Sequence, residues 1–136
     1  MSNVYALQGK GSSGKTDTIT QVFTELVRMY PHAAVQHLTS GTRDIKVIIS
    51  NIKGHTIGIE SLGDPNSRLQ QSLQDFVNAK CDIIFCAART TGMTVNWVNS
   101  LSPPYAVHFI SQSYVTANFN TNNLRVAQSL IKQAGL

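Results

Sequence analysis

The residue types best suited to chemistry lie near the start of the chain, in the segment GKGSSGKT at positions 9–16. Its glycines allow backbone N–H groups to turn inward around phosphate oxygens, and the N-terminus of a following helix adds positive potential. At this spacing the lysine reaches the β- and γ-phosphates of a nucleotide, and the threonine hydroxyl binds Mg²⁺. The predicted phosphate site is made of Gly9, Lys10, Gly11, Ser12, Ser13, Gly14, Lys15 and Thr16, with Asp17 in the next turn.

The flanking sequence supplies the two elements that such a loop needs. Residues 3–8 are centred on apolar side chains and predict a short strand. Residues 15–30 predict a helix, because Ile19, Val22 and Leu26 recur on one face. With G-x-x-x-x-G-K-[ST] between a strand and a helix, the chain resembles the P-loop NTPase superfamily. The resemblance implies a nucleoside triphosphate, ATP or GTP, as ligand and Mg²⁺ as cofactor.

Lys10 adds a second resemblance. A lysine just before the glycines is similar to the deviant Walker A loop, whose extra signature lysine occupies that place. That group usually has glycine where this chain has Ser12, and its domains are longer than 136 residues.

Composition limits the class of protein. The 136 residues fit one domain, 1–136, with 42% hydrophobic and 13% charged residues. No apolar run is long enough to span a bilayer and no signal sequence begins the chain, so we expect a cytoplasmic protein without membrane contact.

The net charge of +4 comes from scattered bases, which makes nucleic acid an unlikely partner. Cys81 and Cys86 match no metal or redox spacing and predict buried thiols.

Predicted elements alternate between strand and helix, which favours an α/β fold with a mostly parallel sheet. We expect a three-layer P-loop NTPase-like sandwich whose five-stranded sheet ends in an antiparallel edge strand. A hairpin over 44–62 would supply that edge. The predicted strands are 3–8, 44–50, 55–62, 82–88 and 105–111, the predicted helices are 15–30, 64–80, 93–101 and one beginning at Thr121, and 31–43 is strand or loop.

This element order resembles the small GTPase core, which implies the strand order 2-3-1-4-5. The chain departs from that family in its base-reading motif. GTPases carry N-K-x-D after a strand, whereas Ala87-Ala88-Arg89-Thr90 stands at the nearest equivalent position, with no aspartate to pair with guanine. ATP is therefore the expected ligand ahead of GTP.

Two acids follow an apolar strand at the edge where a Walker B carboxylate is expected. Glu60 closes the strand, and Glu60-Ser61-Leu62-Gly63 resembles the D-x-x-G of GTPases, whose glycine offers its N–H to the γ-phosphate. Asp64 follows four residues later and has an alternative role as the N-cap of a helix with Pro65 at its first position. Glu60 or Asp64, with Thr16, is expected to organise Mg²⁺ or the attacking water.

Arg89 leaves the central strand at the same edge, where it is placed to stabilise charge on a transferring phosphoryl group. Arg68 could face the γ-phosphate or lie on a solvated helix face. Thr39 and Thr42 are candidates for a switch threonine on Mg²⁺, or are ordinary loop residues. Lys15, Glu60, Asp64 and Arg89 are the predicted catalytic residues.

Three functions fit these residues. The leading hypothesis is a Mg²⁺-dependent ATPase, a phosphohydrolase that works by positioning and electrostatics. The second is a small-molecule or nucleotide kinase, although residues 112–123 contain no basic residue for a lid. The third is a non-catalytic, nucleotide-gated binding module, in which 31–43 changes on nucleotide exchange and the hairpin edge contacts a protein partner or a second copy.

Overall fold

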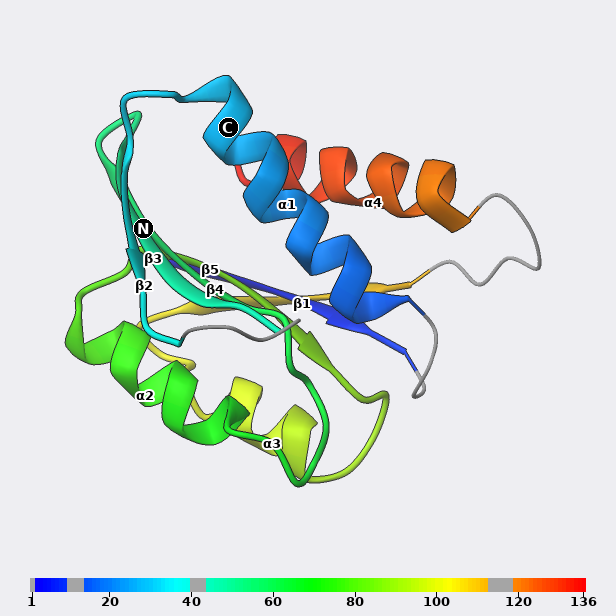
Figure 1. The fold of residues 1–136 in the computed structure, drawn as a ribbon. Helices are drawn as coiled ribbons and strands as arrows, with labels where there is room; N and C mark the ends of the chain where they lie inside the picture. The colour runs from blue at the N-terminus through cyan, green and yellow to red at the C-terminus, as the bar shows by residue number, and fades with distance from the viewer. Residues whose placement is uncertain (1, 10–13, 40–43, 113–118) are drawn as a thin grey trace.

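The computed structural model describes residues 2–9, 14–39, 44–112 and 119–136. Lys10, Gly11, Ser12, Ser13 and Thr42 lie outside the described residues. The elements in chain order are β1 (Asn3–Gln8), α1 (Lys15–Met29), β2 (Ala34–His37), β3 (Lys46–Ile52), β4 (His55–Glu60), α2 (Leu69–Asn78), β5 (Ile83–Ala88), α3 (Met93–Asn99), β6 (Ala106–Ser111) and α4 (Phe119–Gln133) (Figure 1).

The α/β class is confirmed, but the sheet differs from the expected one in strand number and order. Within the described residues the sheet is mixed and has six strands, in the order β2-β3-β4-β5-β1-β6. β4, β5, β1 and β6 are mutually parallel, while β3 is antiparallel to both β2 and β4. The extra strand, β2, comes from the segment 31–43 that the sequence left open, and it forms the edge.

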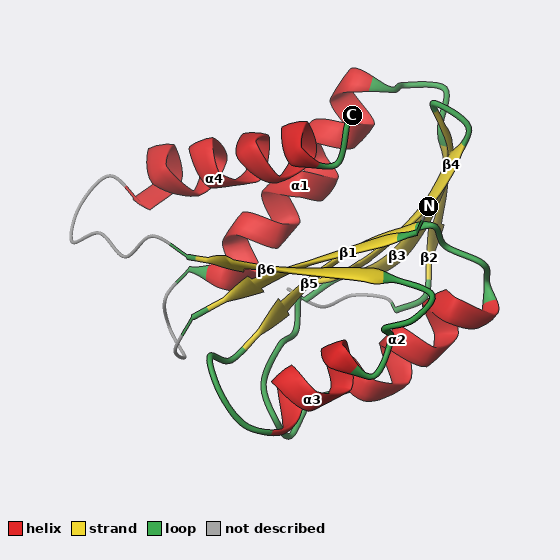
Figure 2. Cartoon of the chain, turned by 180° about the vertical axis from the view of Figure 1, so that it is seen from behind, coloured by secondary structure: helices red, strands yellow, loops and turns green. Residues whose placement is uncertain are grey.

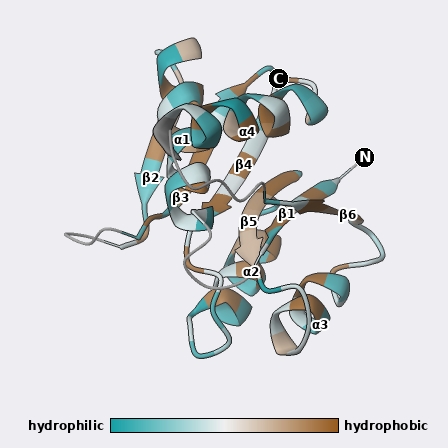
Figure 3. Ribbon diagram, turned by 90° about the vertical axis from the view of Figure 1, so that its right-hand side faces the viewer, coloured by the Kyte–Doolittle hydropathy of each residue, from teal (hydrophilic) through white to brown (hydrophobic). Residues whose placement is uncertain are grey.

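The small GTPase order 2-3-1-4-5 is wrong for this chain, because β5 lies between β4 and β1. Every residue of β5 is buried, as an interior strand should be, but β5 is interior in both orders, so its burial does not determine which strand lies beside the hairpin. In the expected order β1 would have paired with the hairpin instead. In Figure 3 the apolar residues are concentrated in the central strands, β5 among them.

Two helices cover each face of the sheet. α1 and α4 lie on one face, and α2 and α3 lie on the other (Figures 1 and 2). Alternation along the strands sorts their side chains: Ile57 and Ile59 of β4 pack in the α1 layer, whereas Gly58 lies against Phe76 of α2. Among the helices described, none has the length and apolar character needed to cross a membrane.

The start of α2 corrects one expectation. The helix begins at Leu69, not near Asp64, because residues 64–67 first form a turn in which the Ser67 amide donates to the Asp64 carbonyl at 3.1 Å. Asp64 is therefore not the helix N-cap, and its carboxylate is available for another contact.

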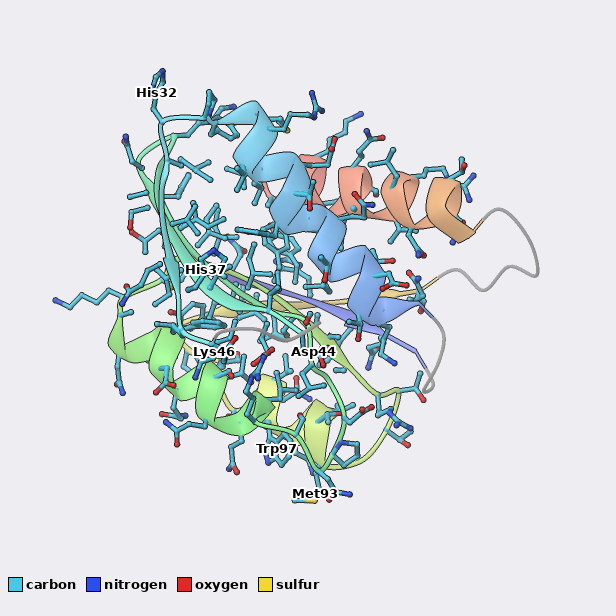
Figure 4. The ribbon with its side chains drawn as sticks, in the orientation of Figure 1. His32, His37, Asp44, Lys46, Met93 and Trp97 are labelled. Carbon is cyan, nitrogen blue, oxygen red and sulfur yellow. The ribbon has the colours of Figure 1, made fainter. Side chains whose placement is uncertain are left out.

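A salt bridge joins the sheet to the middle of α2. The Lys46 ammonium of β3 donates to the Asp75 carboxylate of α2 at 2.5 Å; Lys46 is labelled in Figure 4.

Both cysteines are free and buried, as expected. Cys86 lies within β5, while Cys81 precedes that strand. Burial raises the pKa of each thiol to about 12, so neither is a thiolate at neutral pH.

Gly58→Ala should destabilise the fold. A Cβ at this position would lie 2.5 Å from Cγ of Phe76, so α2 must shift away from β4. We expect a loss of about 1–3 kcal/mol in the free energy of unfolding, measured by urea denaturation. Combining the change with Phe76→Leu should cost less than the sum of the two single changes. An unchanged midpoint for Gly58→Ala would contradict the close contact.

Candidate functional site

The carboxyl ends of three neighbouring strands meet the N-terminus of α1. The Gly9 amide, just after β1, donates to the Ala88 carbonyl at the end of β5 at 3.2 Å. The Thr16 hydroxyl, in the first turn of α1, donates to the Ser61 carbonyl just after β4 at 3.3 Å. These contacts bring the ends of the predicted phosphate loop to the edge of the sheet where ligands of open α/β folds bind.

Lys15 is nearly buried at this edge, with 7% of its surface exposed. Its ammonium donates to the carbonyl of Gly9 at 2.5 Å, so the last lysine of the loop contacts the loop's first residue. Burial lowers the pKa of Lys15, the positive charge of Arg89 lowers it further, and the negative charge of Asp64 opposes both. Gly9 donates in turn to Ala88, the residue before Arg89, so Lys15 lies in one charged cluster with Arg89 and its partner Asp64.

Asp64 and Arg89 form an ion pair across the ends of β4 and β5. Nε and Nη2 of Arg89 donate to Oδ1 of Asp64 at 3.2 and 2.9 Å. The side chains are 53% and 37% exposed, so solvent and ions reach the pair. The backbone of Arg89 is itself fixed, because its amide donates to the Thr94 hydroxyl at 3.0 Å and its carbonyl accepts from Gln8 at 3.4 Å.

Glu60 lies on the other face of the sheet from α1. Its side chain is fully buried, and it accepts from Nε and Nη2 of Arg68 at 2.7 and 3.1 Å. The Ser72 hydroxyl of α2 donates to Oε1 at 2.6 Å and the Leu62 amide to Oε2 at 3.1 Å. Both carboxylate oxygens accept from protein donors, and the hydrogen bonds that Arg68 donates to Glu60 raise the pKa of Arg68. The pair joins β4 to the start of α2.

Gly63 is required by the packing of the backbone after β4 against β5. A Cβ there would lie 2.4 Å from the carbonyl carbon and oxygen of Ala87 in β5. No side chain fits in that space, so the segment after β4 can lie against β5 only with glycine at this position. Because the chain after β4 lies this close to β5, the Asp64 carboxylate can contact the Arg89 guanidinium.

Of the remaining predicted residues, Asp17 and Gly14 lie at the N-terminus of α1, whereas Arg68 and Thr39 lie elsewhere in the fold. Asp17 is exposed in the first turn of α1, and Gly14 begins that helix. Arg68 is bound to Glu60 and is 28% exposed in its side chain. Thr39 is half-buried after β2. In the part of the chain that the structure describes, no three His, Cys, Asp or Glu side chains gather as a metal-binding group.

Sequence reasoning missed Ser61, which holds the end of β4 in place. Its hydroxyl accepts from the Ile45 amide at 2.9 Å and donates to Asp44 at 3.4 Å, while its carbonyl accepts from Thr16. Ser61 is fully buried. Its position directly after the apolar strand was visible in the sequence, but nothing there showed that its carbonyl would contact α1.

Comparisons of the chain with protein families, with curated proteins and with solved structures find no match.

A matched pair of substitutions should separate the two acids by stability. Glu60→Gln places an amide group against the buried side of Arg68 and should lower the free energy of unfolding by about 1–3 kcal/mol. Asp64→Asn removes a solvent-exposed pair and should change it by less than about 1 kcal/mol. Urea denaturation measures both. Equal losses would contradict the contrast in burial.

Proposed function

We propose that the chain binds a nucleoside triphosphate at the carboxyl edge of β1, β4 and β5 and hydrolyses it, as a Mg²⁺-dependent ATPase. Hydrolysis transfers the γ-phosphoryl group to water, with the bond to the bridging oxygen breaking, and gives ADP and inorganic phosphate. The observation that carries the proposal is the cluster of Lys15, Asp64 and Arg89 at the N-terminus of α1, beside the GKGSSGKT segment.

The helix and its lysine support phosphate binding. The N-terminus of α1 carries the positive end of the helix dipole, which favours an anion such as a phosphate group. Gly14 has φ +88°, a conformation that glycine adopts without strain and that leads the chain into the helix. A triphosphate would replace the Gly9 carbonyl as the partner of the Lys15 ammonium. That exchange favours binding, because it gives a buried cation an anionic partner.

The donor set at the edge fits Mg²⁺, which prefers oxygen ligands and binds through one or two protein groups and substrate phosphates. The Thr16 hydroxyl uses its proton on Ser61 and keeps its lone pairs for a cation. Asp64 offers an exposed carboxylate nearby, whereas both oxygens of Glu60 are already bound on the opposite face. Thr16 and Asp64 are therefore the residues we assign to the metal, which would neutralise phosphate charge when bound.

Arg89 and Asp64 have complementary roles in this proposal. In the free protein each neutralises the other, at 2.9 Å. A phosphate group that competes for Arg89 would release the Asp64 carboxylate to orient water or hold the metal. Arg89 would then lie beside the oxygens on which negative charge develops, where a guanidinium donor stabilises the transition state.

Lys15→Ala tests the binding site. Removal of the buried ammonium should abolish measurable binding of Mg²⁺–ATP in calorimetric titration, because its charge is the strongest attraction for the β- and γ-phosphates. Lys132→Ala, an exposed lysine of α4, is the matched control and should bind as the wild type does. Unchanged affinity in Lys15→Ala, with the fold intact, would overturn the proposal.

Asp64→Asn tests catalysis. An amide cannot hold the metal or accept a proton from water as a carboxylate does, so we expect kcat to fall about tenfold or more with less than about threefold change in ATP affinity. Steady-state phosphate release at saturating Mg²⁺–ATP measures kcat, and calorimetric titration measures the affinity. If Glu60→Gln causes this loss and Asp64→Asn does not, then the acid is Glu60 and our assignment is wrong.

A further inference from the structure

A buried polar cluster lies behind the N-terminus of α1, between the end of β6 and the start of α4. The Thr18 hydroxyl donates to Oδ1 of Asn123 at 3.1 Å. Nε2 of Gln112 donates to the Thr18 hydroxyl at 3.0 Å and to Oδ1 of Asn123 at 3.3 Å. Thr18 has no exposed surface and Asn123 is 5% exposed. The three side chains close a ring of hydrogen bonds that joins segments distant in the sequence.

This cluster contacts the glycine that leads into α1. The Thr18 amide donates to the Gly14 carbonyl at 3.0 Å, which is the first hydrogen bond of the helix. A Cβ at Gly14 would lie 3.1 Å from both Oδ1 of Asn123 and Nε2 of Gln112, so the glycine rests directly on these two amides. The Thr18 amide thus binds Gly14, while the Thr18 hydroxyl fixes the position of Thr18 through Asn123 and Gln112.

We propose that Thr18, Asn123 and Gln112 are positioning residues for Gly14 and the first turn of α1. They would fix Gly14 and the first turn of α1 so that the N–H groups there already point toward the phosphates before a ligand arrives. Donors held in place in this way bind more tightly, because less order has to be created on binding. The inference rests on the proposed function, and it adds that affinity depends on three side chains that do not touch the ligand.

The position of Thr18 allows hydrogen bonding to be separated from packing. Thr18→Val keeps the volume and removes the hydroxyl, whereas Thr18→Ser keeps the hydroxyl and removes a methyl group. If the hydroxyl positions the loop, valine is the damaging change and serine is tolerated. If Thr18 only fills space, serine is the more damaging change, because loss of the methyl group creates a cavity that valine would fill.

The experiment is calorimetric titration with Mg²⁺–ATP of the wild type, Thr18→Val, Thr18→Ser and Thr24→Val. Thr24 lies on the same helix, is exposed and donates to the Thr20 carbonyl, so it controls for loss of a threonine hydroxyl on α1. We expect Thr18→Val to weaken binding about threefold to tenfold, because it removes both hydrogen bonds of the Thr18 hydroxyl and only part of that loss reaches the ligand. Thr18→Ser and Thr24→Val should stay within about twofold of the wild type.

Each outcome is decisive. Unchanged affinity in Thr18→Val, or weaker binding by Thr18→Ser than by Thr18→Val, overturns the positioning role while leaving the proposed function standing. Absence of binding by the wild type overturns both. Circular dichroism establishes that each variant is folded at the titration temperature. Should Thr18→Val not fold, Gln112→Met replaces it: weakened binding supports the role, and wild-type affinity overturns it.

Discussion

The close approach of the chain after β4 to the end of β5 is the constraint on which the site depends. Gly63 lies so near Ala87 that a Cβ would be 2.4 Å from its carbonyl group. This contact brings Asp64 to Arg89, and the neighbouring Ser61 carbonyl accepts from Thr16. One glycine therefore allows acid, arginine and the first turn of α1 to meet at one edge, so the proposed chemistry depends on backbone packing.

The two acids that the sequence left as alternatives lie in different environments. Ile57 and Ile59 of β4 pack beneath α1. Because side chains alternate along a strand, Glu60 points to the opposite layer, where Arg68 and Ser72 donate hydrogen bonds to its carboxylate. Asp64 follows the strand and is free of that alternation. This contrast explains how Glu60 serves the packing of α2 while Asp64 stays open to solvent, and it is the basis on which we assign Asp64 to the metal.

Sequence patterns predicted most elements but not how strands are ordered. The apolar runs of β1 and β5 indicate burial on both faces, and such a run does not say which strand lies beside it. In the folded chain Glu60 and Ile59 lie on opposite faces of β4, and only the fold shows which helix covers each face. The ring of Thr18, Asn123 and Gln112 joins α1, α4 and the end of β6, so no local pattern could reveal it. The α2 start was missed because Asp64 is a good capping residue, and here its carboxylate pairs with Arg89 instead.

The most direct test of the proposed nucleotide site is a map of backbone amide shifts by NMR as Mg²⁺–ATP is added to the labelled protein. The largest changes should fall at Gly14, Lys15 and Thr16, with further changes at Asp64 and Arg89 across the edge. A groove far from the proposed site, lined by Met29, Ile131 and Leu136 near the C-terminal ends of α1 and α4, provides the contrast. Changes confined to that groove, or none at any amide, would contradict a triphosphate site at the N-terminus of α1.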